Sequence, residues 1–304
     1  MVALFVTSPE KGSGKTTLCA GLGKYLQNTG KKVGYLKPVA GGGDSDAGFM
    51  KNILSLDETV ETLSDKNAYE KVSQGKDVVI VEGDYQSAAE IAKALEAKVL
   101  IVEAYSGKPS KKEDKYTNLG ELLLGVIINK VPESRIEQAH STAGEKVIGI
   151  IPEDRVLLAL TMGELAERIQ GEVLRGAEQS AALVENIMLG ALAVDHGPEY
   201  FGRKENKMVV LRSDRSDMQM AAMETSTRCL VITGDTPLKP VVLDRAEEKN
   251  MPIILVKEDV ATVVETIEGA LGGGKFSQQN KLPRIVELVE QNVDMEKVKK
   301  GLGL

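Results

Sequence analysis

The sequence contains no tryptophan and few residues that could hold a zinc-type metal ion. Among its 304 residues, the only cysteines are Cys19 and Cys229, and the only histidines are His140 and His196. Neither histidine has a second histidine or a cysteine at ligand spacing, so we expect no metal site of this kind. The two cysteines lie in separate apolar runs, which predicts buried thiols and a cytoplasmic protein.

The sequence also lacks long apolar runs and clusters of basic residues. No stretch of about 18 apolar residues occurs, so we expect no membrane-spanning helix. The N-terminal run reads as a strand leading directly into a glycine-rich loop, which is not the pattern of a cleavable signal. The net charge is -7 and no stripe of Lys and Arg is present, so nucleic acid is not an expected partner.

Short apolar runs alternate with amphipathic stretches through the first half of the chain. The expected strands cover residues 2–7, 32–38, 77–82, 98–103, 124–129 and 147–151. Runs that are apolar on both faces and separated by helices are typical of a parallel sheet covered on both sides. The pattern predicts a doubly wound α/β domain, mostly parallel, over residues 1–172.

A second alternation of helices and strands follows, and it predicts a smaller α/β domain over residues 179–304. The strands expected in it cover residues 207–211, 229–233 and 252–256. The helices expected in it cover residues 180–192, 218–225, 240–248 and 260–271, with a final amphipathic helix over residues 281–293.

Residues 8–17 follow the first expected strand and open the first expected helix, which is the context of a P-loop. Gly12 and Gly14 can adopt backbone angles that let N–H groups converge on phosphate oxygens. Lys15 would reach the β- and γ-phosphates, and the Thr16 hydroxyl would bind Mg²⁺. Pro9 stands where the usual pattern has its first glycine, and the alternative is a plain turn with an exposed lysine. The strand–loop–helix context favours binding of Mg-ATP or a related nucleotide.

Polar residues follow three later strands of the same predicted sheet. Lys37 ends the second strand, Asp44 and Asp46 follow in a glycine-rich loop, and Glu82 ends the third strand at a Walker B-like position. Ligands bind at the carboxyl edge of such sheets, so we expect Asp46 and Glu82 to join the P-loop threonine around Mg²⁺. Asn129 ends a later strand and could pair with a purine base. Each of these residues alone could be an ordinary loop residue, and only their joint placement favours a site.

These motifs, taken in order over residues 1–172, resemble dethiobiotin synthetase and the synthetase domains of cobyrinic acid a,c-diamide synthase. The motifs are Gly-Lys-Thr-Thr, Lys-Pro-Val, Asp-Ala, Val-Glu-Gly and Asn-x-x-Pro. The resemblance implies that Lys37 contacts a carbamate or carboxylate substrate, which makes Lys15 and Lys37 the catalytic candidates. The nucleotide-binding residues that it implies are Gly12, Ser13, Gly14, Lys15, Thr16, Thr17 and Asn129, and the metal ligands are Thr16, Asp46 and Glu82.

The whole arrangement is similar to the N-terminal half of long bacterial phosphate acetyltransferases. Residues 150–155, Ile-Ile-Pro-Glu-Asp-Arg, resemble a characteristic stretch of that group. Residues 180–293 resemble the DRTGG domain that follows it there, which implies a homodimer. The motif that names this domain reads Asp-Arg-Ser-Asp at residues 214–217, without its two glycines, and Thr-Gly-Asp at residues 233–235 forms the second loop.

Two functions remain open from the sequence. The first is a regulatory or sensory protein, in which Mg-ATP binding changes the second domain and a partner protein reads that change. The second is an ATP-dependent synthetase, in which ATP phosphorylates a carboxylate or carbamate held by Lys37 and an amine displaces the phosphate. Residues 104–118 are short and polar for a substrate cleft, so we favour the regulatory function. A structural protein that keeps the loop without using it is a third reading.

Overall fold

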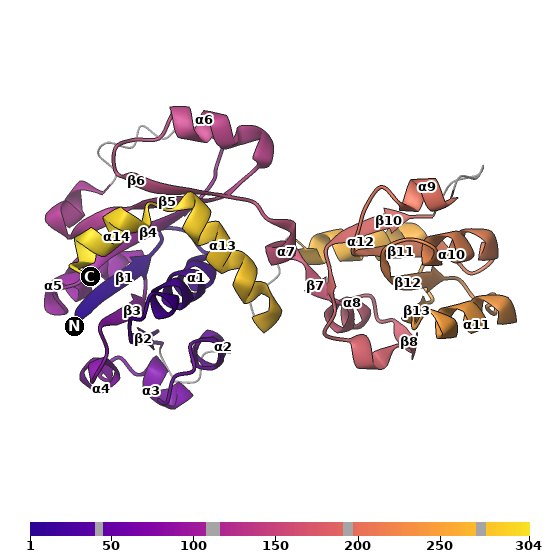
Figure 1. Ribbon diagram of the computed structural model, residues 1–304, viewed down its shortest axis with the longest axis horizontal. Coiled ribbons are helices and arrows are strands. Elements are labelled where there is room, and N and C mark those ends of the chain that lie inside the picture. Colours follow the sequence, from indigo (N-terminus) through magenta and orange to yellow (C-terminus); the bar gives the residue numbers. More distant parts are fainter. Residues whose placement is uncertain (40–44, 108–115, 191–196, 272–277) are drawn as a thin grey trace. The chain divides into compact units, whose positions relative to one another are not determined.

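The computed structural model describes residues 1–39, 45–107, 116–190, 197–271 and 278–304. The chain forms two compact units (Figure 1), one made of Met1–Asp154 and Phe276–Leu304 and the other of Arg155–Lys275. Among the described residues, no helix combines the length and the apolar character that crossing a membrane requires.

The first unit is built on a six-stranded parallel sheet with the strand order β2-β3-β1-β4-β5-β6. Its interior strands are buried over nearly their whole length, as the continuous apolar runs predict. The predicted doubly wound α/β fold is therefore confirmed. The strands are β1 Val2–Thr7, β2 Val33–Leu36, β3 Val78–Glu82, β4 Lys98–Ala104, β5 Leu123–Val131 and β6 Val147–Pro152.

Short helices connect these strands, and right-handed crossovers place them on both faces of the sheet because the strand order reverses at β1. The α-helices of this unit are α1 Lys15–Asn28, α2 Ser45–Ile53, α3 Val60–Ser64, α4 Tyr69–Ser73, α5 Ala88–Ala94, α6 Ile136–Ser141, α13 Leu282–Asn292 and α14 Met295–Leu302. The 3₁₀ turns are η1 Tyr85–Ser87, η2 Thr117–Leu122, η3 Glu133–Arg135 and η5 Gln279–Lys281.

The C-terminal helices belong to the first unit, whereas the sequence suggested that they belong with residues 179–304. Helix α13 lies beside α1 (Figure 1). A Cβ atom on Gly21 of α1 would lie 2.9 Å from both Ile285 Cγ1 and Val289 Cγ2, so the glycine allows the two helices to approach closely. Val293 then forms a β-bridge with Gly149 of β6. The apolar stripe of α13 is thus buried within the first unit.

The second unit has a five-stranded sheet with the order β10-β11-β12-β13-β8, in which β10 to β13 are parallel and β8 is antiparallel to β13. Helices α8 and α12 pack on one face, and α9, α10 and α11 pack on the other. The strands are β8 Glu172–Arg175, β10 Asn186–Leu189, β11 Lys207–Arg212, β12 Thr227–Thr233 and β13 Ile253–Val256, with β7 Leu160–Thr161 and β9 Leu183–Val184 paired separately. The helices are α7 Arg155–Leu158, α8 Met162–Arg168, η4 Ala177–Gln179, α9 Gly197–Phe201, α10 Ser216–Met223, α11 Pro240–Glu248 and α12 Val260–Leu271.

The helix predicted over residues 180–192 is wrong. Its described part contains β9 and β10 instead, because pairing with β7 and β11 overrides the helical spacing of its apolar residues. Residues 191–192 of the prediction lie outside the described residues.

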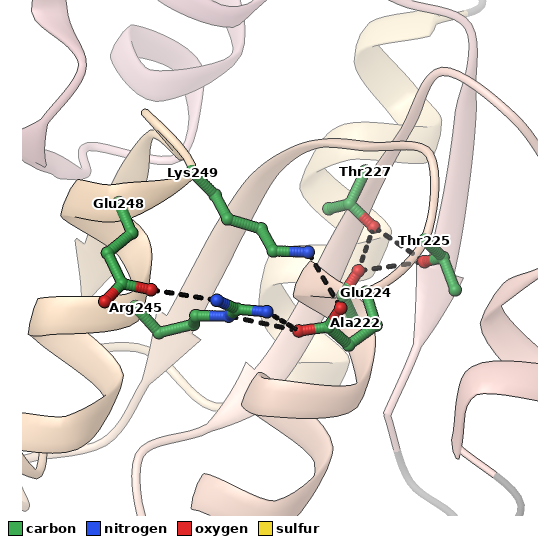
Figure 2. Close-up of polar contacts among 7 residues, drawn as sticks. All are labelled: Ala222, Glu224, Thr225, Thr227, Arg245, Glu248 and Lys249. Carbon is green, nitrogen blue, oxygen red and sulfur yellow. Dashed lines mark hydrogen bonds and ion pairs between the residues drawn. The ribbon is translucent and has the colours of Figure 1, made fainter.

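A polar cluster joins α10 to α11 in this unit. Figure 2 shows Glu224, directly after α10, between two cations of the α11 region. Its Oε1 atom accepts from Arg245 Nη2 at 2.6 Å, and its Oε2 atom accepts from Lys249 Nζ at 2.8 Å. The hydroxyls of Thr225 and Thr227 both donate to the Ala222 carbonyl, so the end of α10 is held by side chains.

Candidate nucleotide site

The P-loop connects β1 to α1 beside the point where the strand order reverses, which is the usual ligand position in such sheets. Gly12 has a φ angle of 73° and Gly14 one of 94°, both in the left-handed region that favours glycine. Gly14 is the N-cap residue of α1. The first N–H groups of the helix therefore face the loop together with the positive end of the helix dipole, as an anion site requires. Lys15, Thr16 and Thr17 are half-buried on this first turn.

Asn129 holds the loop from the end of β5. Its Nδ2 atom donates to the Ser13 carbonyl at 2.8 Å, and its Oδ1 atom accepts from the Lys130 N–H at 2.9 Å. A Cβ atom on Gly14 would lie 2.3 Å from Asn129 Nδ2, so only glycine fits against this amide. The structure places Asn129 at the predicted site, and its contact with a base stays a prediction.

Two buried hydroxyl groups belong to this segment. Thr7 ends β1 and Ser13 lies in the loop, and their side chains are 0% and 1% exposed. Within the part of the chain that the structure describes, neither hydroxyl oxygen has a hydrogen-bond partner. Because buried polar atoms are normally paired, these two groups fit a loop built to receive an oxygen-rich ligand.

Thr16, Lys37, Asp46 and Glu82 come together at the carboxyl edge of the sheet. Thr16 Oγ1 lies 2.9 Å from Glu82 Oε1 and 3.3 Å from Asp46 Oδ2. Lys37 Nζ forms an ion pair with Asp46 Oδ2 and lies 3.5 Å from Glu82 Oε1. The contacts link the four side chains of the predicted site directly, although Asp44 falls outside the described residues.

The donor set fits Mg²⁺. Mg²⁺ is usually held by one or two carboxylates, substrate phosphates and several waters, and Thr16, Asp46 and Glu82 offer one hydroxyl and two carboxylates. In the described ranges, no group of three His, Cys, Asp or Glu side chains could enclose a metal without such help. Lys37 contacts the same oxygens, Asp46 Oδ2 and Glu82 Oε1, so a metal ion and this ammonium would share one negative site.

Tyr35 supports this site from the sheet and was missed in the sequence. Its hydroxyl donates to Glu82 Oε2 at 2.9 Å, and both side chains are buried. Burial, followed by the negative charge of Glu82, raises the pKa of Tyr35 well above its usual value, so the phenol remains a donor. Residues two apart on a strand share a face, and this spacing relative to Lys37 is the signal that could have revealed Tyr35.

A second polar group, also missed in the sequence, surrounds Glu103 near the end of β4. Tyr116 donates its hydroxyl proton to the buried Glu103, and its ring meets Tyr85 edge-on with centroids 5.6 Å apart. Tyr85 in turn donates to Asn118 Oδ1 at 3.2 Å. Burial and the Glu103 hydrogen bond raise the pKa of Tyr116. Residues 104–118 were expected to be too short and polar to line a substrate cleft, and residues 108–115 of this stretch lie outside the described part.

Comparisons with known proteins agree with this geometry. A family model described as an AAA domain matches residues 2–120, and one described as a DRTGG domain matches residues 164–270. The chain joins an AAA-type P-loop domain to a DRTGG domain. This confirms the fusion that the sequence motifs suggested.

The chain is similar to phosphate acetyltransferases and to dethiobiotin synthetases. The phosphate acetyltransferase of Pseudomonas aeruginosa is 24% identical over 376 residues, which cover 100% of this chain and 52% of that protein. The ATP-dependent dethiobiotin synthetase BioD of Methanococcus vannielii is 28% identical over 198 residues, which cover 49% of this chain and 92% of that protein. The chain therefore spans about half the length of the phosphate acetyltransferases that it matches.

A likeness to a solved structure is also found. The CBS and DRTGG domains of a Clostridium perfringens pyrophosphatase, in complex with diadenosine tetraphosphate, are 13% identical with a TM-score of 0.34. The match covers 46% of this chain and 70% of that chain.

The two motif loops of the DRTGG domain follow β11 and β12. The charged side chains of the first loop form local ion pairs, Asp214 with Arg212 at 2.6 Å and Arg215 with Asp217 at 2.8 Å. Arg215 precedes α10, so its guanidinium is used to fix the first turn of that helix. The second loop turns at Gly234, whose φ angle is 94°.

Proposed function

We propose that the P-loop domain binds Mg-ATP and that the DRTGG domain responds to this binding, which makes the chain a regulatory or sensory protein. The convergence of Thr16, Asp46 and Glu82 beside a glycine-capped helix N-terminus is the observation that carries the proposal. In it, Gly12, Ser13 and Gly14 cradle the phosphates, and Thr17 supports the first turn of α1. Lys15 neutralises phosphate charge, and Asn129 pairs with the base. A coupling of about 1–3 kcal/mol between two domains would be ordinary for such a protein.

The test is a calorimetric titration of the full chain with Mg-ATP, with phosphate release followed in the same samples. We expect binding in the unchanged protein and a loss of at least about tenfold in affinity for Lys15→Ala, because its ammonium no longer meets the phosphates. Lys11→Ala, at an exposed lysine of the same loop, is the matched control and should bind normally. The proposal fails if the unchanged protein does not bind or if both variants bind equally well.

A synthetase is the second candidate, and the position of Lys37 supports it. The ammonium lies at the metal-binding carboxylates, where it could also hold a carboxylate or carbamate close to the transferred phosphoryl group. The dethiobiotin synthetase relative matches this half of the chain. Steady phosphate release that depends on an added carboxylate or diamine, and that Lys37→Ala abolishes, would favour the synthetase over the sensor.

The proposal also covers the cellular location, the oligomeric state and the partner of the protein. We infer a cytoplasmic homodimer that signals to a partner protein. Light scattering at several protein concentrations, with and without Mg-ATP, tests the dimer and whether nucleotide alters it.

A further inference from the structure

The DRTGG domain contains a cavity of 590 Å³ at the carboxyl ends of β12 and β13. Cavities of about 300–1,000 Å³ are typical of small-molecule sites, and the carboxyl edge of parallel strands is where open α/β sheets bind ligands. The lining residues all lie in the second unit. They belong to β8, β12, β13, the Gly234 loop and α11, or lie next to β8 and β13 in the sequence.

Part of the cavity lining is apolar and comes from the edge strand β8, the neighbouring strands and α11. Leu174 of β8 is 42% exposed, and it lines the cavity with Ile232, Leu255 and Leu243 of α11. Leu243 and Leu255 are only partly buried against the core on this face. An apolar ligand would remove this surface from water, at about 25 cal/mol for each Å² buried.

The rim of the cavity is acidic. Glu172, Asp235 and Glu258 contribute three carboxylates, and Lys257 is the single cation in the lining. All four side chains are exposed at the surface. Within the described ranges, none of the three carboxylates takes part in a side-chain hydrogen bond or an ion pair. Glu224 of the same unit, by contrast, is held by two cations (Figure 2).

We propose that this cavity binds a small organic cation, an amine with an aliphatic or aromatic body. The ammonium group lies at Glu172, Asp235 and Glu258, and the apolar body lies on Leu174 and Leu255. An anion of similar size meets three like charges and one lysine, so a nucleotide or a free carboxylate is the disfavoured ligand.

This inference deepens the proposed function, because it supplies a ligand class for the sensing domain. It stands on residues of the second unit alone, so amine binding does not need the P-loop. A failure of nucleotide binding therefore leaves it intact, and the two proposals can be tested in one set of samples.

The experiment is a titration of the ¹⁵N-labelled full chain, followed through the amide signals of Gly234 and Lys257. The probe is 2-phenylethylamine, and the comparison ligands are 2-phenylethanol and 3-phenylpropanoate, which keep the phenyl body and change the charge. We expect the amine to bind at least about threefold more tightly than the alcohol, since an exposed ion pair contributes modestly, and the carboxylate to bind most weakly.

The matched variants are Glu172→Gln with Asp235→Asn for the rim and Glu178→Gln as an exposed control that does not line the cavity. The rim variant, which keeps only Glu258 of the three carboxylates, should lose most of the preference for the amine over the alcohol, while the control should keep it. Lys15→Ala should bind the amine like the unchanged protein. Equal binding of all three probes by the unchanged protein, no shift at these amides, or tighter binding of the carboxylate would overturn the proposal.

Discussion

Gly14→Ala should damage the P-loop through two separate effects. The φ angle of 94° lies in a region that costs a residue with a Cβ atom about 1–2 kcal/mol. The new Cβ would also lie 2.3 Å from Asn129 Nδ2, which must then move and give up its 2.8 Å hydrogen bond to Ser13. Losing that bond adds about 1 kcal/mol, so we expect about 2–3 kcal/mol in total.

Gly12→Ala separates these effects. Its φ angle of 73° is also positive, but no atom lies within 4 Å of the added Cβ, so only the backbone cost of about 1–2 kcal/mol applies. Urea unfolding followed by tyrosine fluorescence measures the difference. Every tyrosine except Tyr200 lies in the first unit, so the signal mainly reports the unfolding of that unit.

The double variant Gly14→Ala with Asn129→Ala completes the cycle. Without the amide there is nothing for the new methyl group to displace, so the double variant should cost less than the sum of the single variants by about 1 kcal/mol. Mg-ATP titrations of the same four proteins show whether the loop has kept its shape. Additive costs, or a Gly14→Ala cost no greater than that of Gly12→Ala, would refute the close approach as the reason for glycine here.

Three further predictions concern the polar contacts. Glu82→Gln should raise the Mg²⁺ concentration needed for half-maximal ATP binding by about tenfold or more, because one of two carboxylates is lost, and titrating Mg²⁺ at fixed ATP measures this. Tyr35→Phe removes the hydrogen bond to Glu82 Oε2 and should cost about 1 kcal/mol or more in urea unfolding, since it leaves a buried carboxylate oxygen with one partner fewer. Lys249 and then Arg245 lower the pKa of Glu224, so its stabilisation is present above its unfolded pKa of about 4.3 and is lost as pH falls through the lower folded value. The melting temperature of Glu224→Gln should therefore fall below that of the unchanged protein at pH 7 and approach it in acid, and a constant gap would contradict this.

The sequence predicts the six strands of the first sheet and the central strands β11, β12 and β13 of the second, because burial on both faces leaves continuous apolar runs. It does not predict the edge strand β8, which is only half-buried. It fails over residues 180–192, where apolar residues such as Val184 and Met188 recur at helical spacing but belong to short strands. These strands form because they pair with β7 and β11, which are distant in sequence, and a local sequence pattern cannot predict such pairing.

In the candidate site, too, the sequence predicts the features that depend on local pattern and misses those that depend on distant partners. Glycine spacing and strand ends predict Gly14, Thr16 and Glu82, because backbone conformation and sheet edges are local consequences of sequence. The contact between Asn129 and Ser13 depends on the register of β5 relative to β1, two strands away in the sheet. Tyr35 looks like an ordinary core residue until Glu82 is seen to meet it.

The position of the C-terminal helices follows from packing that a sequence pattern cannot specify. The apolar stripe of α13 predicts a buried face, but any exposed apolar groove in either unit would satisfy it. Gly21 on α1 selects the partner, since a side chain there would collide with Ile285 and Val289. Arg284 then reaches Asp154 at 2.8 Å, where the first pass of the chain through this unit ends. The chain leaves the P-loop domain at Asp154 and returns to it after the DRTGG domain. The returning helix α13 packs on α1, which is the helix that begins at the P-loop. Under the proposed function, coupling between nucleotide binding and the DRTGG domain would act through this covalent connection.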